Sequence, residues 1–281
     1  LYRFGKALIP KPVNTAQKTH PIDRFISTWE ALGFKILENP EWINIESSDV
    51  GGKDLSFKVS THMGTENAIL SSLFLKGVTT INNSAEEPEI DDLIGFLNEI
   101  GADVKRTQAR KIEINGSSIY KGGASFVQSD KNEAVFFATS ALVTGGNVTL
   151  KNVNKTSISS FLSLLNNIGA NFEFQGNDLT VWRAGETFSA FEVTSKPAPG
   201  FITDWMSSAC ILATCCNGES TLYEGVYADA WDYIKDINRM GARIDFASDD
   251  PQKILVKGPT PLKGATLDIE NTGSGLAMIL A

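Results

Sequence analysis

One helix pattern occurs four times along the chain, and this repeat constrains the fold more than any other feature. Each copy ends in a glycine, and the copies follow one another at intervals of about 70 residues. Before each glycine, apolar residues occupy the same five positions, with the i, i+3, i+4, i+7 spacing of one helix face. The four copies are Ile22, Phe25, Ile26, Trp29, Leu32 and Gly33; Ile90, Leu93, Ile94, Leu97, Ile100 and Gly101; Ile158, Phe161, Leu162, Leu165, Ile168 and Gly169; and Ala230, Tyr233, Ile234, Ile237, Met240 and Gly241. The sequence therefore predicts four amphipathic helices, each ended by a left-handed glycine.

The segments between these helices also repeat. Each glycine is followed by two short apolar runs separated by turn residues, as at 171–181, which is typical of a β-hairpin. A second apolar helix is expected to end at a glycine and lead into a strand, as at Gly77, Gly146 and Gly218. The expected repeat is helix, hairpin, strand, helix, strand. It is longer than the roughly 20 to 50 residues of common solenoid repeats, so compact α/β subdomains are expected.

The length of 281 residues corresponds to about two domains. Residues 116–123 are rich in Gly and Ser, which favours a crossing between domains there. We therefore expect a first domain at 1–126 and a second at 127–281. The chain starts without Met and ends inside an apolar helical pattern, so a piece of a longer protein is expected.

Composition and charge exclude several classes of function. With 25 Lys and Arg against 33 Asp and Glu, the net charge is -8, and the basic face that nucleic acid requires is not indicated. Apolar runs are far shorter than the roughly 18 residues of a membrane helix, and the first residues lack a signal-peptide core. We expect a cytoplasmic protein without a nucleic-acid or membrane partner. Cys210, Cys215 and Cys216 share one apolar stretch and have no metal-site spacing with the histidines, which favours buried thiols.

Four segments of the chain resemble one family of enzymes. They are Pro21-Ile22-Asp23, residues 82–90 (Asn-Asn-Ser-Ala-Glu-Glu-Pro-Glu-Ile), Thr203-Asp204-Trp205, and residues 238–242 (Asn-Arg-Met-Gly-Ala). In this order, and with a repeated βαβαββ subdomain, they resemble the UDP-N-acetylglucosamine enolpyruvyl transferases over essentially the whole chain. The shikimate-phosphate transferases share the fold but are less similar at 82–90 and at Thr-Asp-Trp.

The resemblance implies an α/β fold, an inside-out α/β barrel of six βαβαββ subdomains in two domains, of which about four would be present. It implies a reaction of peptidoglycan precursor synthesis, in which the sugar 3-hydroxyl of UDP-N-acetylglucosamine adds to C2 of phosphoenolpyruvate, C3 is protonated, and phosphate is eliminated. The implied partners are these two small molecules, and no cofactor or metal. We expect a monomer.

The clearest residue that the resemblance implies is Asp204, as the general base for the sugar hydroxyl. On the residues alone, Thr203 or Asp204 would instead cap the helix that begins at Trp205.

The resemblance also implies that Pro21, Ile22 and Asp23 hold the uridine and that Val226 contacts the sugar nucleotide. On the residues alone, Pro21 and Asp23 suit the first turn of a helix, and Val226 suits a core position.

The chain departs from the family at the mobile loop before Pro21. The position of the proton donor is Thr15, whose hydroxyl is a far weaker acid than a thiol or a carboxyl. The arginine that meets phosphate is replaced by His20, which cannot form the bidentate fork of a guanidinium. A single loop histidine is also typical of an ordinary surface residue.

Further anion-binding residues are replaced as well. Two family segments with arginine correspond to 228–231 (Ala-Asp-Ala-Trp) and 271–274 (Asn-Thr-Gly-Ser). The family's Lys-x-Ser-x-Gly segment becomes 59–63, with Thr61 at the serine position, and Lys131 stands where a cation is expected. Each lost charge-assisted bond would weaken a phosphate site by about 1.5 to 3 kcal/mol.

Two functions follow from these observations. The first is an enolpyruvyl transferase in which other groups compensate for the altered loop. The second is a non-catalytic relative that keeps the fold and at most a nucleotide-sugar site. Asp204 favours the first, whereas Thr15 and His20 favour the second, and the fold alone does not decide between them.

Overall fold

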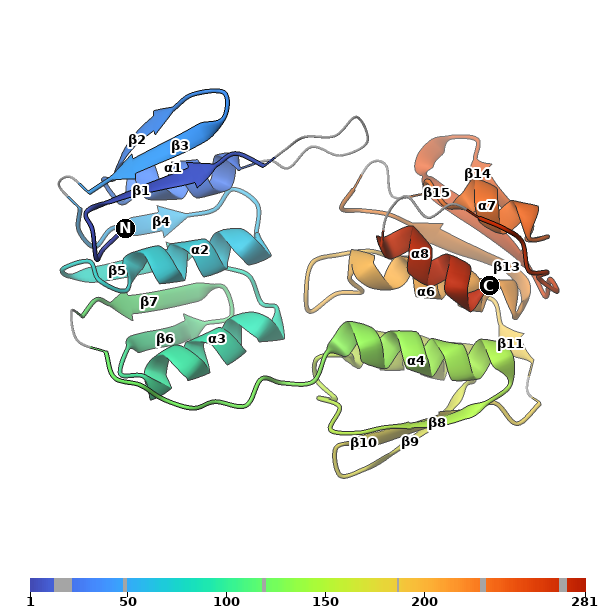
Figure 1. The fold of residues 1–281 in the computed structure, drawn as a ribbon. Helices are drawn as coiled ribbons and strands as arrows, with labels where there is room; N and C mark the ends of the chain where they lie inside the picture. Colours follow the sequence, from blue (N-terminus) through green and yellow to red (C-terminus); the bar gives the residue numbers. More distant parts are fainter. Residues whose placement is uncertain (13–21, 48–49, 118–119, 186, 228–230, 268–271) are drawn as a thin grey trace. The chain divides into compact units, whose positions relative to one another are not determined.

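A computed structural model describes residues 1–12, 22–47, 50–117, 120–185, 187–227, 231–267 and 272–281. The chain divides into two compact units, unit 1 (Leu1–Val127) and unit 2 (Gln128–Ala281). Unit 1 runs from blue to green in Figure 1, and unit 2 runs from green to red. Each unit is described by itself below.

Unit 1 contains a sheet of order β1-β3-β2 and a sheet of order β4-β5-β7-β6. Each of the three helices described in this unit lies between strands along the chain, and every strand is short. In chain order the elements are β1 (Lys6–Pro10), α1 (Asp23–Ala31), β2 (Lys35–Glu38), β3 (Trp42–Glu46), β4 (Asp54–Ser56), α2 (His62–Ser72), β5 (Val78–Asn82), α3 (Pro88–Glu99), β6 (Asp103–Gln108) and β7 (Lys111–Asn115).

Unit 2 repeats this plan with a sheet of order β8-β10-β9 and a sheet of order β11-β13-β15-β14, in which β12 also pairs with β13. In chain order the elements are α4 (Lys131–Thr144), β8 (Asn147–Leu150), α5 (Ser159–Ile168), β9 (Asn171–Gln175), β10 (Asp178–Trp182), β11 (Phe188–Ser189), β12 (Glu192–Thr194), a 3-10 turn (Thr203–Trp205), α6 (Met206–Thr214), β13 (Cys216–Tyr223), α7 (Ile234–Arg239), β14 (Ile244–Ala247), β15 (Asp250–Gly258) and α8 (Thr272–Leu280).

The pairing of strands confirms the repeated subdomain. In both the β4–β7 and the β12–β15 segments, the first strand runs parallel to the second, and the following hairpin adds antiparallel strands beside it. These two segments are complete βαβαββ subdomains. The sheets β1-β3-β2 and β8-β10-β9 have the same arrangement without the first strand. The predicted α/β class and the four hairpins are therefore confirmed.

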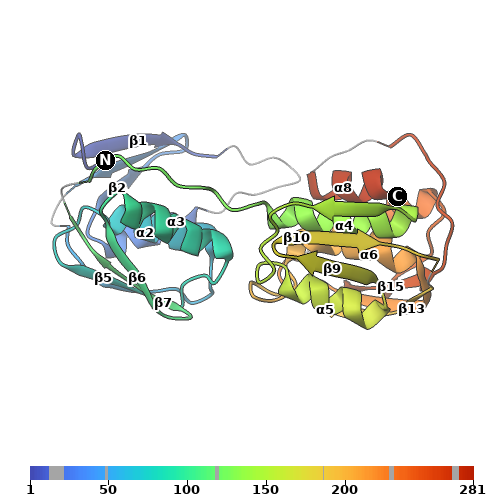
Figure 2. The same ribbon diagram turned by 90° about the horizontal axis from the view of Figure 1, so that it is seen from below.

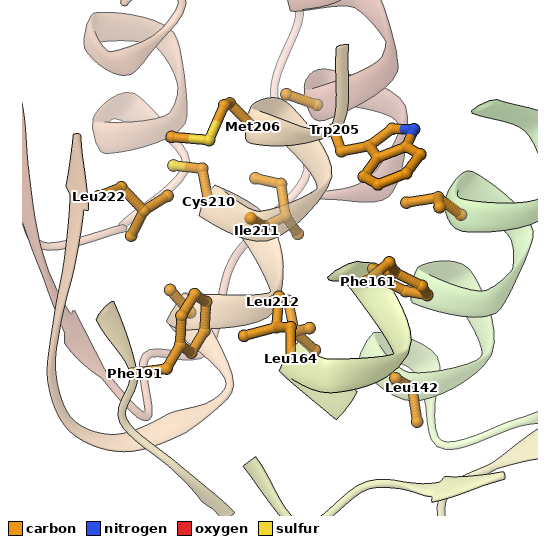
Figure 3. Close-up of a cluster of buried hydrophobic side chains, with 14 of the residues drawn as sticks. Leu142, Phe161, Leu164, Phe191, Trp205, Met206, Cys210, Ile211, Leu212 and Leu222 are labelled. Atoms are coloured by element: carbon orange, nitrogen blue, oxygen red, sulfur yellow. The ribbon is translucent and has the colours of Figure 1, made fainter. Parts of the chain in front are cut away.

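Helices α4 and α6 pack on each other inside unit 2, and sheets lie outside them, with β8 and β10 against α4 and β13 and β15 against α6, as the inside-out architecture requires. Helix α6 packs against both α4 and α8, and Figures 1 and 2 show these three helices side by side. Every residue of α6 is buried, as expected for a helix that is apolar on all sides. In Figure 3, Leu212 lies beside Leu164 of α5, whereas Met206 and Cys210 lie on the side of α6 that faces Leu222 of β13.

The four repeat glycines end their helices as predicted. Gly33, Gly101, Gly169 and Gly241 all have positive φ, between 80° and 103°, where a side chain would be strained.

Three details of the repeat differ from the prediction. Helix α7 begins at Ile234 instead of near residue 230, because Trp231 and Tyr233 are both buried, and side chains two residues apart face different sides of a helix. Gly218 lies within β13 instead of before it, since pairing already begins at Cys216. Finally, the expected strand after the second hairpin is absent from the described residues 116–117 and 120–130, where the Gly- and Ser-rich crossing has little β-propensity.

The same pair of asparagine hydrogen bonds occurs in two copies of the repeat and is expected to stabilise the fold. The side chain of Asn98 accepts from the Val104 N–H at 3.0 Å and donates to the Val104 carbonyl at 2.8 Å. Asn238 makes the same pair of bonds to Ile244, at 3.0 and 2.8 Å. Each asparagine therefore joins the end of a helix to the strand after it.

We expect Asn98→Ala and Asn238→Ala each to lower the free energy of unfolding by about 1 to 3 kcal/mol, because two partly buried backbone groups lose their partners. Urea unfolding followed by circular dichroism measures the loss, with the exposed Asn217→Ala as control. Equal stability of Asn238→Ala and Asn217→Ala would contradict this assignment.

The three cysteines differ in exposure. Cys210 and Cys216 are buried as predicted, whereas Cys215 is only partly buried because it follows the last residue of α6. Burial raises the pKa of the Cys210 and Cys216 thiols to about 12 each. At pH 8 the reactive thiolate would then be about 10⁻⁴ of each thiol.

We expect a disulfide reagent at pH 8 to modify Cys215 in the native protein and to reach the other two thiols only in urea. The reason is that both the buried location and the raised pKa suppress thiolate formation. The Cys215→Ser variant should be nearly unreactive until it unfolds. Rapid native modification of two or more thiols would overturn this prediction.

Candidate active site

Asp204 lies in the 3-10 turn Thr203–Trp205, directly before the buried helix α6. Its side chain is exposed, whereas the neighbouring Trp205 is buried. The Oδ2 atom of Asp204 accepts a hydrogen bond of 3.2 Å from Nδ2 of Asn132. The turn therefore presents an oriented carboxylate at the surface of unit 2.

Asn132 lies in the first turn of α4 and connects this helix to the turn. Its Nδ2 donates to Asp204, and its Oδ1 accepts from Nε1 of Trp205 at 2.8 Å. Because the indole only donates and the carboxylate accepts, these two contacts define which way the amide points. The main chain of Asn132 is held in turn by Asp130, which caps α4 by accepting from the Asn132 N–H at 2.7 Å.

The capping alternative for Thr203 and Asp204 is wrong. The Thr203 hydroxyl donates to Oε1 of Glu224 at 2.7 Å, and Asp204 binds Asn132. Neither the 3-10 turn nor α6 has a side-chain hydrogen bond to its cap among the described contacts. Both side chains are directed toward other elements, where they orient the turn.

Glu224 follows β13 and is completely buried, at 0% exposure. Its Oε1 atom accepts from two hydroxyls, those of Ser195 and Thr203. The same oxygen accepts from the backbone N–H groups of Val226 at 2.8 Å and Tyr227 at 3.2 Å. One carboxylate oxygen thus connects the segment after β12, the turn of Asp204 and the loop after β13.

The Glu224 side chain is shielded from solvent. Tyr233 is buried nearby, and burial, followed by the charges near it that include Glu224, raises its pKa well above the ordinary value. Oε2 of Glu224 is buried without a hydrogen-bond partner among the described residues. The Glu224 carboxylate is therefore only half satisfied.

Two other predicted residues of unit 2 lie on the same elements as this cluster. Lys131 is the first residue of α4, next to Asn132, and is largely buried. Val226 follows Glu224 closely and is 42% exposed, so it is not the core residue that its apolar character alone favoured. The structure thus brings Lys131, Asp204 and Val226 to segments joined by the bonds of Asn132 and Glu224.

The predicted residues of unit 1 lie near the start of two helices. Asp23 is exposed in the first turn of α1, and Ile22 directly precedes it. Thr61 caps α2, since its hydroxyl accepts from the Gly64 N–H at 3.4 Å. Thr15, His20 and Pro21 lie outside the described residues, so their predicted roles stay predictions.

The last turns of α1 and α2 are joined by a hydrogen bond of 3.0 Å from Nε1 of Trp29 to the Ser71 hydroxyl. Ile22, Asp23 and Thr61 lie at the other, N-terminal ends of these two helices.

Within the described part of the chain, no cluster of three His, Cys, Asp or Glu side chains has the arrangement of a metal site. None of the described helices is long and apolar enough to cross a membrane.

Comparison with known proteins establishes the family. The family model of EPSP synthase (3-phosphoshikimate 1-carboxyvinyltransferase) matches residues 14–271. UDP-N-acetylglucosamine 1-carboxyvinyltransferase 1 of Caldanaerobacter subterraneus is 30% identical over 281 residues, which are 100% of this chain and 67% of the relative. The chain belongs to the enolpyruvyl transferase family. The protein of the same name from Legionella pneumophila is also 30% identical, over 99% of this chain.

Solved structures of enolpyruvyl transferases have the same fold. The enolpyruvyl transferase NikO from Streptomyces tendae matches 99% of this chain with a TM-score of 0.85 at 15% identity, covering 66% of that chain. An EPSP synthase from Acinetobacter baumannii matches 90% of this chain with a TM-score of 0.67 at 20% identity, covering 60% of that chain. This chain spans 55% and 67% of the length of its Legionella and Caldanaerobacter relatives.

Two polar residues beside Asp204 do not follow from the family pattern. Asn132 carries no motif, and its contact with Asp204 joins positions 72 residues apart. Glu224 gave no clear signal either, because the strand before it already contains the polar residues Glu219, Ser220 and Thr221. Ser195, whose hydroxyl is buried against Glu224, gave no signal.

Proposed function

We propose that this enolpyruvyl transferase transfers the enolpyruvyl group of phosphoenolpyruvate to the 3-hydroxyl of UDP-N-acetylglucosamine and releases phosphate. The observation that carries the proposal is the exposed, oriented carboxylate of Asp204. The names of the two relatives support the sugar nucleotide as acceptor.

In this reaction Asp204 takes the proton of the sugar hydroxyl as its oxygen bonds to C2 of phosphoenolpyruvate. C3 gains a proton in the same addition. Loss of a proton from C3 then restores the double bond as phosphate leaves. Asn132 contributes by donating a hydrogen bond to Oδ2 of Asp204, which fixes the orientation of the carboxylate. A catalytic group that is already oriented lowers the entropic part of the reaction barrier.

The residues that the family resemblance assigns to substrate binding are proposed to keep those roles. Val226 would contact the sugar nucleotide, and Ile22 and Asp23 would hold the uridine. Lys131 is the proposed cation for the anionic groups, because ammonium groups bind phosphate as point charges. Thr61 is proposed as a hydroxyl contact, and Thr15 and His20 occupy the loop positions of the acid and of the phosphate ligand.

Phosphate release from phosphoenolpyruvate, with and without UDP-N-acetylglucosamine, tests this function. Release that depends on the sugar nucleotide is the expected result. Calorimetric titration with UDP-N-acetylglucosamine provides the second measurement. A folded chain that binds the sugar nucleotide but releases no phosphate would overturn enolpyruvyl transfer and favour a non-catalytic relative.

A further inference from the structure

Glu224 occupies a repeat position that holds asparagine elsewhere in the chain. The sixth residue after Gly77 is Asn83, the sixth after Gly146 is Asn152, and the sixth after Gly218 is Glu224. The Asn83 side chain makes two contacts at this place, since its Nδ2 donates to the Phe57 carbonyl at 2.9 Å and its Oδ1 accepts from the Arg110 guanidinium at 3.2 Å. One side-chain oxygen of Glu224 instead accepts four hydrogen bonds, and this difference requires a separate explanation.

Stability does not explain the carboxylate. Glu224 is fully buried, and a buried charge destabilises the fold unless hydrogen bonds and opposite charges compensate. Four donors converge on Oε1, but Oε2 has no partner among the described residues. A neutral amide, as at Asn83, would avoid this cost.

Three of the four donors belong to the two segments that carry the proposed base and the proposed sugar contact. The Thr203 hydroxyl belongs to the residue directly before Asp204. The N–H groups of Val226 and Tyr227 belong to a loop whose side chains are 42% and 61% exposed. Ser195 adds a further connection, because its hydroxyl donates to Glu224 and accepts from the Gly225 N–H at 2.9 Å.

We propose that Glu224 is a positioning residue that holds the turn of Asp204 and the Val226–Tyr227 loop in one fixed relation, so that the base meets the hydroxyl of a bound sugar nucleotide. This role rests on the proposed function, because it assigns the base and the sugar contact to these two segments. Glu224 touches no substrate itself. Since all four bonds share one oxygen, a displacement of that oxygen shifts both segments together.

Steady-state kinetics of Glu224→Asp and Glu224→Gln test the proposal. The aspartate is one methylene shorter and cannot reach all four donors, whereas the glutamine keeps the length and an accepting oxygen. For Glu224→Asp we expect kcat to fall about 10- to 100-fold, with a raised KM for UDP-N-acetylglucosamine and an unchanged KM for phosphoenolpyruvate. Glu224→Gln should retain more activity than Glu224→Asp.

Asn238→Ala is the matched control for a purely structural effect. It also removes hydrogen bonds in unit 2, but those bonds join α7 to β14 and touch neither segment. Its kcat per folded molecule should equal that of the parent protein. A Glu224→Asp variant with parental kcat and KM, or with losses no larger than those of Asn238→Ala, would overturn the proposal.

Hydrogen exchange provides a readout that does not depend on turnover. In Glu224→Asp the amides of Trp205, Val226 and Tyr227 should all exchange faster, whereas Asn238→Ala should leave them unchanged. Faster exchange at Val226 and Tyr227 alone would overturn the link to the Asp204 turn. If the parent protein releases no phosphate but shows this joint pattern, the proposed function fails while the positioning link holds.

Discussion

Replacing Asp204 with asparagine is expected to lower kcat for phosphate release by about 10² to 10⁴-fold, the usual contribution of a general base. Asparagine has nearly the same shape as aspartate, but its amide cannot take up the proton of the sugar hydroxyl. Its carbonyl oxygen can still accept the bond from Asn132 that Oδ2 accepts now. Assays of phosphate release at saturating concentrations of both substrates measure the effect.

The fold of this variant should be intact, because the Asp204 side chain is exposed while the residues around it are buried. Circular dichroism and the urea midpoint check this point. Asp245→Asn is a suitable control, since Asp245 is an exposed carboxylate of β14 in the same unit. Equal kcat values for Asp204→Asn and Asp245→Asn would remove Asp204 from the mechanism.

The loss in Asp204→Asn also separates the two functions that the sequence left open. An enolpyruvyl transferase needs the base for each turnover, whereas a binding protein needs only shape and polarity at that position. Asp204→Asn should therefore lower kcat by the factor given above and leave the affinity for UDP-N-acetylglucosamine within about threefold of the parent value. A parallel loss of affinity would show that the carboxylate mainly binds the sugar.

Local sequence patterns predicted the repeated helices and hairpins, because residues close together in the chain determine where these elements form. The stripe before Gly169 predicts a helix, and α5 buries Phe161, Leu162 and Leu165 as the spacing requires. The turn residues after that glycine predict the β9–β10 hairpin, which the structure contains. The predicted start of α7 was wrong. The apolar spacing places Ala230 and Tyr233 on one helix face, but Trp231 is also buried, and the helix begins only at Ile234.

The contacts around Asp204 could not be predicted in the same way. Asn132 and Glu224 reach this turn from 72 and 21 residues away along the chain, so only the folded unit brings them together. The resemblance located Asp204 itself, but it gave no reason for the direction of its carboxylate. That direction depends on side-chain hydrogen bonds between elements, which neither periodicity nor spacing encodes.

Trp205 links the stability of unit 2 to the orientation of Asp204. Its indole is 2% exposed and makes edge-to-face contacts with Phe161 and Phe201, at centroid distances of 6.4 and 5.4 Å. Figure 3 shows the ring among the buried side chains near α6, with Phe161 beside it. The same indole holds Asn132 through its N–H, so the ring supports both the core and the amide that orients Asp204.

Replacing Trp205 with alanine is expected to lower the free energy of unfolding by about 3 to 5 kcal/mol, because the variant loses a buried ring and leaves a cavity. Urea unfolding followed by circular dichroism measures this loss, and Phe246→Ala, at a half-exposed position of β14, should cost much less. Trp205→Phe keeps most of the apolar contact but removes the donor to Asn132, so it should lose less stability while kcat still falls. If kcat follows stability in both variants, Trp205 acts only through the core; if Trp205→Phe loses activity out of proportion to its stability, the hydrogen bond to Asn132 positions the base.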